Sequence, residues 1–350
     1  MWSELLFGYG LFILEILTVL LLLIGGIALI ISLKQKKTQQ SGELVITDLS
    51  AEYKENHTKL RDFHLTDEAF KQAEKARKKE EKRKLKAEKS KAKKGEAVNE
   101  RKPHLFVLNF HGDISASETA ALREEISAIV SVAEPNDEVL LRLESPGGVV
   151  HGYGLAASQL MRLKQHNIKL TVAVDKVAAS GGYMMACTAD KIVAAPFAVI
   201  GSIGVVAQVP NIHRLLKKHQ VDVDVMTAGE YKRTVTVLGE NTEKGKQKFQ
   251  QELEETHELF KHFVAQNRPQ LQIERIATGE HWFGKQALEL NLVDEIGTSD
   301  DIILNALKEK TVLSVKYVTK KSLIQKLGKQ AEESAESIIM RGLNQKTRFF

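Results

Sequence analysis

Cysteine is almost absent from the sequence: Cys187 stands alone among 350 residues. No intrachain disulfide can form, so a disulfide-stapled fold is excluded and a buried apolar core must hold the folded part together. Apolar residues make up 43% of the chain, which is enough for such a core. The length is typical of about two domains. Cys187 itself falls on a predicted helix, and we expect it to be buried.

Several patterns that mark other classes of protein are also missing. Residues 104–320 contain no metal-ligand spacing, no phosphate-binding loop and no alternation of basic and aromatic residues. We therefore expect no metal, no cofactor and no nucleic-acid partner. The net charge of +5 does not change this, because residues 71–102 hold 15 Lys and Arg against 6 Asp and Glu. That segment carries +9, and the rest of the chain carries −4.

A long uncharged apolar segment lies near the N-terminus. From Ile16 to Leu33 there are 18 residues without a charge, and residues 11–14 extend the run with Glu15 as the single interruption. About 20 apolar residues in a helix span a bilayer. A cleaved signal peptide is the alternative, but it usually has a basic start, a shorter apolar run and a small-residue cleavage site. We expect an uncleaved transmembrane helix within residues 1–37 that contacts membrane lipid.

Lysines flank this segment on one side, at Lys34, Lys36 and Lys37. No Lys or Arg precedes them. The positive-inside rule therefore predicts that the chain beyond the helix lies in the cytoplasm.

Two polar regions separate the predicted anchor from the predicted folded domain. Residues 38–68 are a polar region of mixed composition, and residues 69–103 are a Lys/Glu-rich linker without an apolar stripe. The linker predicts a solvated helix or a disordered tether. A spacer is the simpler interpretation, and binding to anionic lipid is the alternative. Residues 104–318 are expected to form the main domain, and residues 319–350 a helical tail.

Within the main domain, short apolar runs alternate with segments of helical spacing. The runs predict strands, and apolar residues three or four positions apart predict helices. This alternation is typical of parallel βαβ units and of the α/β class. The predicted strands are 105–110, 139–143, 170–174, 192–195, 221–225 and 313–317. The predicted helices are 117–134, 151–165, a short one from about 180, 243–267, 284–291 and 300–309.

Ser180 is the candidate nucleophile. It comes shortly after a predicted strand, begins a predicted helix, and is followed by Gly181 and Gly182. The helix dipole favours negative charge at this position, and glycine lets the backbone approach a substrate carbonyl closely. A serine at a helix start is also a common N-cap, so the motif alone leaves that alternative open.

A second glycine turn, Ser145-Pro146-Gly147-Gly148, ends another predicted strand. Ligands of open α/β sheets bind at such ends. A backbone N–H of this turn, together with the N–H of Gly181, could form an oxyanion hole, where one donor contributes roughly 3–4 kcal/mol to acyl transfer. A plain structural turn is the alternative.

Histidine is poorly placed to serve as the base that such a serine needs. No histidine lies between His166 and His213, and neither of these nor His151 forms a motif with the serine.

Lysine is the alternative base, and Lys232 follows the turn Gly229-Glu230-Tyr231. Burial would have to lower its pKa from about 10.4 toward neutrality. Lys176 and Lys191 are nearer in sequence but lie on no glycine turn. Ser202, in a third small-residue turn, could orient the lysine by accepting a hydrogen bond, and a purely structural turn is equally open.

Taken in order, these motifs resemble the signal peptide peptidase A family of serine proteases. The matching segments are 145–148, 178–183, 201–205 and 229–232. The resemblance covers about residues 104–310, and the predicted anchor and polar region resemble the N-terminal extension of short bacterial members.

This resemblance implies a fold and a catalytic pair. The fold would be a Clp protease/crotonase-like superhelix of ββα units, assembled into a ring-like homo-oligomer. Ser180 would be the nucleophile and Lys232 the general base. Relatives with the Clp fold use a histidine about 25 residues after the serine, where this chain has Val205. That difference favours lysine.

Three further residues take roles from the resemblance. Ser202 would help to position the lysine, and the backbone N–H groups of Gly148 and Gly181 would line the oxyanion hole. The resemblance also implies a catalytic domain on the periplasmic side of a bacterial inner membrane. We take this side, while the cytoplasmic assignment from the lysine flank stays open.

The expected function is therefore proteolysis by a single-pass, membrane-anchored serine endopeptidase. It would hydrolyse peptides, such as signal-peptide remnants or membrane-associated polypeptides, through an acyl-enzyme. One alternative is a catalytically silent scaffold or partner-binding protein of the same fold. Another is a crotonase-like acyl-CoA enzyme, which would share the oxyanion-hole glycines but need no nucleophilic serine.

Overall fold

A computed structural model describes residues 10, 12–22, 25, 42–93 and 101–319. The chain divides into two compact units, Leu44–Tyr317 and a second made of Met1–Glu43 and Val318–Phe350. Most of the second unit, including nearly all of the predicted tail 319–350 and much of the predicted anchor, lies outside the described residues. Residues 12–22 are helical. In the described part of the chain no helix is both long enough and apolar enough to cross a membrane.

The larger unit is built on a seven-stranded sheet with the order β1-β10-β2-β3-β4-β6-β9. All strand pairs from β10 to β9 are parallel, which confirms the predicted α/β class. The strands are β1 (Gly42–Asp48), β2 (His104–His111), β3 (Glu138–Glu144), β4 (Lys169–Val174), β6 (Lys191–Ala194), β9 (Glu295–Ile296) and β10 (Thr311–Thr319).

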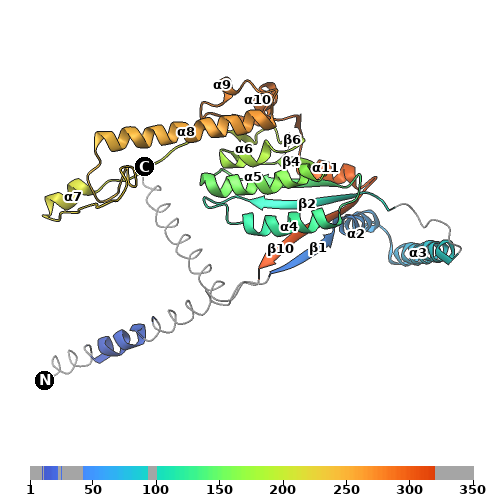
Figure 1. The fold of residues 1–350 in the computed structure, drawn as a ribbon. Helices are drawn as coiled ribbons and strands as arrows, with labels where there is room; N and C mark the ends of the chain where they lie inside the picture. Colours follow the sequence, from blue (N-terminus) through green and yellow to red (C-terminus); the bar gives the residue numbers. More distant parts are fainter. Residues whose placement is uncertain (1–9, 11, 23–24, 26–41, 94–100, 320–350) are drawn as a thin grey trace, which may run out of the picture. The chain divides into compact units, whose positions relative to one another are not determined.

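Helices cover both faces of this sheet (Figure 1). On β2, Phe106 and Leu108 join the larger core with α4 and α5, whereas Leu105 and Val107 join a smaller core with α2 and α11. Burial on both faces explains why the strands are continuous apolar runs. The helices are α2 (Leu49–Asp62), α3 (Asp67–Lys93), α4 (Thr119–Val132), α5 (Val150–Gln165), α6 (Gly181–Ala186), α7 (His213–Lys218), α8 (Glu243–Asn267), α9 (Ile273–Ile276), α10 (Gly284–Glu289) and α11 (Ser299–Ala306).

A small second sheet lies beside the end of β3. It consists of β5 (Val177–Ala179), β7 (Val199–Gly201) and β8 (His281–Phe283), with β5 parallel and β8 antiparallel to the central β7. Ser145, just after β3, forms an isolated parallel bridge with Ala178 of β5. This bridge joins the two sheets and brings two of the glycine turns together.

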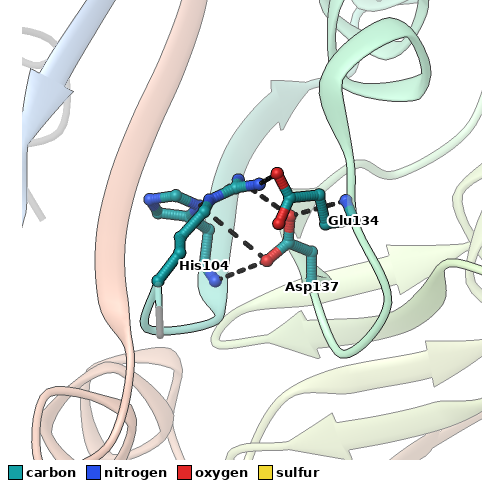
Figure 2. A network of polar contacts seen from close by, with 4 residues as sticks. His104, Glu134 and Asp137 are labelled. Carbon is teal, nitrogen blue, oxygen red and sulfur yellow. Dashed lines mark hydrogen bonds and ion pairs between the residues drawn. The ribbon is translucent and has the colours of Figure 1, made fainter. Parts of the chain in front are cut away.

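The opposite end of β3 is fastened by Asp137, which is only 5% exposed. Its carboxylate accepts hydrogen bonds from the backbone N–H groups of His104 (2.7 Å) and Glu134 (2.9 Å) and from Arg101 Nη2 (3.1 Å) (Figure 2). A buried carboxylate requires such donors. The contacts fix where β2 and β3 begin, and β3 leads directly to the first glycine turn.

Two predictions for polar segments have different outcomes. The predicted linker, 69–103, is helical up to Lys93 as part of α3, and residues 94–100 lie outside the described residues. The strand predicted at 221–225 is wrong: these residues lie in the segment 205–242, which contains the short helix α7 and no strand. The alternation of valine and aspartate favours a strand, but Val221 and Val225 are each 47% exposed and lie beside no strand that could supply backbone hydrogen bonds.

Candidate active site

The first glycine turn lies directly against Ser180. The Ser145 backbone N–H donates to Val177 O (2.8 Å), and the Ala179 N–H donates back to Ser145 O (3.0 Å). Gly147 has φ +93°, and a Cβ added there would lie 2.7 Å from the Cβ of Ser180. Glycine is therefore required at this position both by its backbone conformation and by the approach of the serine.

Ser180 has an unusual backbone conformation, with φ 53° and ψ −119°. Its N–H donates to Gly201 O (2.8 Å), and its carbonyl accepts from Met184 N (2.9 Å) in the first turn of α6. Its side chain makes no capping hydrogen bond with that helix, so the N-cap role considered above is not observed. Positive φ at a serine is strained, and strain of this kind gathers at functional sites. A sharp strand-to-helix turn also displays the nucleophile in α/β-hydrolases.

Two backbone donors near this serine are unpaired. Neither the N–H of Gly148 nor that of Gly181 has an acceptor among the residues that the structure describes. Gly181 is buried, where an unpaired backbone N–H is rare, whereas Gly148 is exposed. An oxyanion hole needs unpaired N–H donors of this kind close to the nucleophile, here Ser180.

These groups open into a cleft of about 800 Å³. Four of the sequence-predicted site residues line it together: Gly148, Ser180, Gly181 and Ser202. Ser202 also has positive φ (52°), and its N–H donates to Glu280 O (2.7 Å). Much of the rest of the wall is apolar, and the branched, thioether and aromatic side chains there are Ile114, Val149, Val150, Met184, Val205, Val206 and Phe260.

Lys232 does not line this cleft. It is exposed in the segment 205–242, which we call the arm, and its backbone N–H donates to Gly229 O (3.2 Å). Figure 1 shows the arm leading into the start of α8, with α7 within it. The single chain therefore does not bring together the two predicted members of the dyad.

The two alternative lysines form ion pairs elsewhere. Lys176 Nζ lies 3.0 Å from both carboxylate oxygens of Glu144, and Lys191 pairs with Glu295. Neither lysine lines the cleft.

One histidine in the cleft was missed by the sequence reasoning. His151, His166 and His213 do not line the cleft, but His257 of α8 does, with Nε2 3.3 Å from Ile203 O. It lies one helical turn before the buried Phe260, on the side of α8 that faces the cleft. The three-residue spacing of His257 and Phe260 places both on one face of the helix. The sequence does not reveal which part of the fold that face packs against.

Cys187 is fully buried at the end of α6, as expected, and its Sγ lies 3.2 Å from Met184 O. Burial raises the pKa of its thiol to about 12, so it is a packing residue. In the described part of the chain no group of three or more His, Cys, Asp or Glu is placed to hold a metal ion.

Comparison with known families decides the assignment. The model of the peptidase family S49 N-terminal region matches residues 4–160, and that of peptidase family S49 matches residues 162–313. The chain belongs to peptidase family S49. The family resemblance drawn from the motifs is confirmed, and it extends over far more of the N-terminal part than the motifs themselves.

Two relatives of this S49 peptidase agree with the family match. It is 70% identical over 351 residues to "Probable protease SohB" of Haemophilus influenzae, covering 100% of this chain and 99% of that protein. It is 50% identical over 303 residues to "Probable protease SohB" of Buchnera aphidicola subsp. Schlechtendalia chinensis, with coverages of 86% and 99%. A solved 1510-N membrane-bound stomatin-specific protease, a lysine variant in complex with a substrate peptide, covers 65% of this chain and 96% of its own at 14% identity and TM-score 0.41.

Proposed function

We propose that this S49 peptidase is a serine endopeptidase that cleaves peptides through an acyl-enzyme on Ser180. One observation carries the proposal: the strained, displayed Ser180 faces the same cleft as two unpaired backbone donors, Gly148 N–H and Gly181 N–H. Residues 104–318 would be the catalytic domain, with the ββα superhelix of Clp-type proteases.

In the proposed reaction, Ser180 Oγ attacks the scissile carbonyl while its proton passes to the neutral amine of Lys232. The N–H groups of Gly148 and Gly181 stabilise the oxyanion of the tetrahedral intermediate. The lysine returns the proton to the leaving amine, and the same lysine then activates water that hydrolyses the ester. Ser202 would hold the lysine by accepting a hydrogen bond from its Nζ.

The dyad would form in a homo-oligomer, with the arm of one copy carrying Lys232 to the cleft of another. The exposure of Lys232 and its absence from the cleft of its own chain support this. The arm also exposes large apolar side chains that a second copy would cover: Val206, Val209, Ile212, Leu215, Val221, Val225, Met226, Tyr231, Val237 and Leu238.

The peptidase would be anchored in the bacterial inner membrane by a transmembrane helix within residues 1–37. The apolar run at 16–33 supports this part of the proposal. We place the catalytic domain on the periplasmic side. Protease added to intact spheroplasts would then digest the chain beyond residue 40, and protection until the membrane is permeabilised would show a cytoplasmic domain.

Substitution of the dyad tests the proposed chemistry. Ser180→Ala and Lys232→Ala should each abolish hydrolysis of an apolar fluorogenic peptide by the full chain in detergent, with unchanged circular dichroism. Lys176→Ala is the matched control, because it removes a lysine paired with Glu144 outside the cleft, and it should keep full activity. Full activity in either dyad variant would refute the dyad. A folded wild type that neither cleaves peptides nor reacts with serine probes would favour the scaffold alternative.

A further inference from the structure

A buried chain of hydrogen bonds lies behind the first glycine turn. The Gly147 N–H donates to Ser145 Oγ (3.1 Å), Ser145 Oγ lies 2.7 Å from the Tyr153 hydroxyl, and that hydroxyl donates to Asp113 O (2.8 Å). The side chains of Ser145 and Tyr153 are fully buried. The chain therefore links α5, the end of β3 and the loop after β2 through two buried hydroxyl groups.

The direction of every bond in this chain is fixed. A backbone carbonyl can only accept, so the single phenol proton of Tyr153 goes to Asp113 O. The Ser145 proton must then be donated to the Tyr153 oxygen, which leaves Ser145 Oγ to accept from Gly147 N–H. Each donor has one acceptor. Removal of either hydroxyl leaves a buried group unpaired, which is costly in the protein interior.

The ring of Tyr153 supports the second glycine turn as well. A Cβ added at Gly181 would lie 2.3 Å from Cγ of this ring, so the backbone at the start of α6 packs directly against the side chain of Tyr153. One residue of α5 thus contacts both turns that supply the proposed oxyanion donors, through its hydroxyl on one side and its ring on the other.

We infer that Tyr153, acting through Ser145, is a positioning residue for the oxyanion hole. Gly147 and Gly148 are adjacent glycines, so the peptide between them has little steric reason to keep one orientation. The hydrogen bond from Gly147 N–H to Ser145 holds the peptide before this one, and the Val149 N–H, which donates to Ile114 O (2.8 Å), holds the peptide after it. The peptide that carries the Gly148 N–H is thus fixed from both ends, and Tyr153 supports one of the two holds. This inference rests on the proposed function, because it assigns the support of the same catalytic site.

Kinetics of three variants test it. Tyr153→Phe keeps the ring and removes the hydroxyl, and Ser145→Ala breaks the chain at its next link. Each should lower kcat by about tenfold to a hundredfold with KM nearly unchanged, since a misaimed donor costs transition-state stabilisation rather than substrate binding. The double variant should be no slower than the slower single variant, because both break one chain. Independent, multiplying losses would overturn the inference.

Tyr183→Phe is the matched control. Tyr183 is also fully buried, and although it lies two residues after Gly181, its hydroxyl donates to Leu292 O (2.9 Å) and bonds to neither glycine turn. Tyr183→Phe should lower thermal stability about as much as Tyr153→Phe, because each variant loses one buried hydrogen bond. It should leave kcat within about twofold of wild type. An equal loss of kcat in both variants would show a merely structural role for Tyr153.

Amide hydrogen exchange separates failure of this inference from failure of the proposed function. Exchange in a peptide that covers 145–150 should be faster in Tyr153→Phe and Ser145→Ala than in wild type and Tyr183→Phe, whatever the activity. Unchanged protection there would overturn the inference even in an active enzyme. Faster exchange in the two variants, together with a wild type that neither cleaves peptides nor reacts with a serine probe, would overturn the proposed function alone.

Discussion

The backbone of Ser180 explains why a common residue type can be singled out at this one position. A strained φ is retained where the surroundings enforce it. Here the N–H is held by Gly201 O, the carbonyl by the first turn of α6, and the Cβ by close contact with Gly147. Ser180 thereby lines the cleft, and its hydroxyl does not cap the helix.

The sequence predicted this local constellation because its residues come in short motifs. The turns at 145–148 and 178–183 follow predicted strands, and parallel strands place their carboxyl ends at one edge. The position of Lys232 could not be derived in the same way, since it depends on the path of an arm without regular pairing. His257 was missed for a related reason: its helix reaches the cleft only through tertiary packing.

Glu125 gives a prediction of pH dependence at the level of one residue. It is 4% exposed, and burial raises the pKa of its carboxyl to about 7, although the Tyr317 N–H 2.7 Å away lowers it. The folded state therefore holds this proton more tightly than the unfolded state does. The contribution to stability is full below about pH 4.5 and is lost as the pH rises to about 7, by about 3 kcal/mol.

Urea unfolding of wild type and Glu125→Gln between pH 4.5 and 8 measures this effect. Glutamine keeps an acceptor for the Tyr317 N–H but cannot ionise, so the variant should lose less stability over this range and be the more stable protein at pH 8. Equal slopes of unfolding free energy against pH in the two proteins would contradict the prediction.

At the scale of elements, α8 forms one wall of the cleft, and its end is anchored by an ion pair. Arg268, only 3% exposed, donates to both carboxylate oxygens of Asp294 (2.8 and 2.7 Å) and to Asn291 O (2.9 Å). Burial opposes ionisation of Asp294, but hydrogen bonds from Arg268 and the Ile192 N–H outweigh it and lower its pKa. This ties α8 to the β6–β9 edge of the sheet.

Asp294→Ala should therefore lower the free energy of unfolding by about 3–5 kcal/mol, because it leaves a buried guanidinium unpaired. Glu295→Ala is the neighbouring control. It removes an exposed pair with Lys191 and should cost less than about 1 kcal/mol. Denaturant unfolding of the two variants compares them directly, and similar losses would show that the buried pair does not anchor the helix.

The elements themselves show which patterns can be interpreted from sequence. Strands buried on both faces, such as β2 and β3, are long apolar runs and were predicted within one or two residues. The strands of the small sheet have three residues each, too few to establish a periodicity. In residues 221–225 valine alternates with aspartate as it would in a strand, but no neighbouring strand pairs with them. The local pattern therefore predicted a strand that does not form.

At the scale of the whole molecule, the separation of Lys232 from the cleft makes a prediction about assembly. If the arm of one copy serves the cleft of another, mixed oligomers of Ser180→Ala and Lys232→Ala contain intact sites formed by the lysine of one variant and the serine of the other. Co-expression or subunit exchange should then restore part of the activity, up to about a quarter in a random mixture of equal parts. No recovery in oligomers shown to be mixed would place both dyad members in one chain.

The central claim, that Ser180 is the nucleophile, is tested most directly by covalent labelling of the full chain with a fluorophosphonate, followed by peptide mass spectrometry. The account predicts one modified residue, Ser180, in wild type, no label in Ser180→Ala, and much slower labelling in Lys232→Ala. A label on another serine of the folded protein, or a labelling rate independent of Lys232, would contradict it.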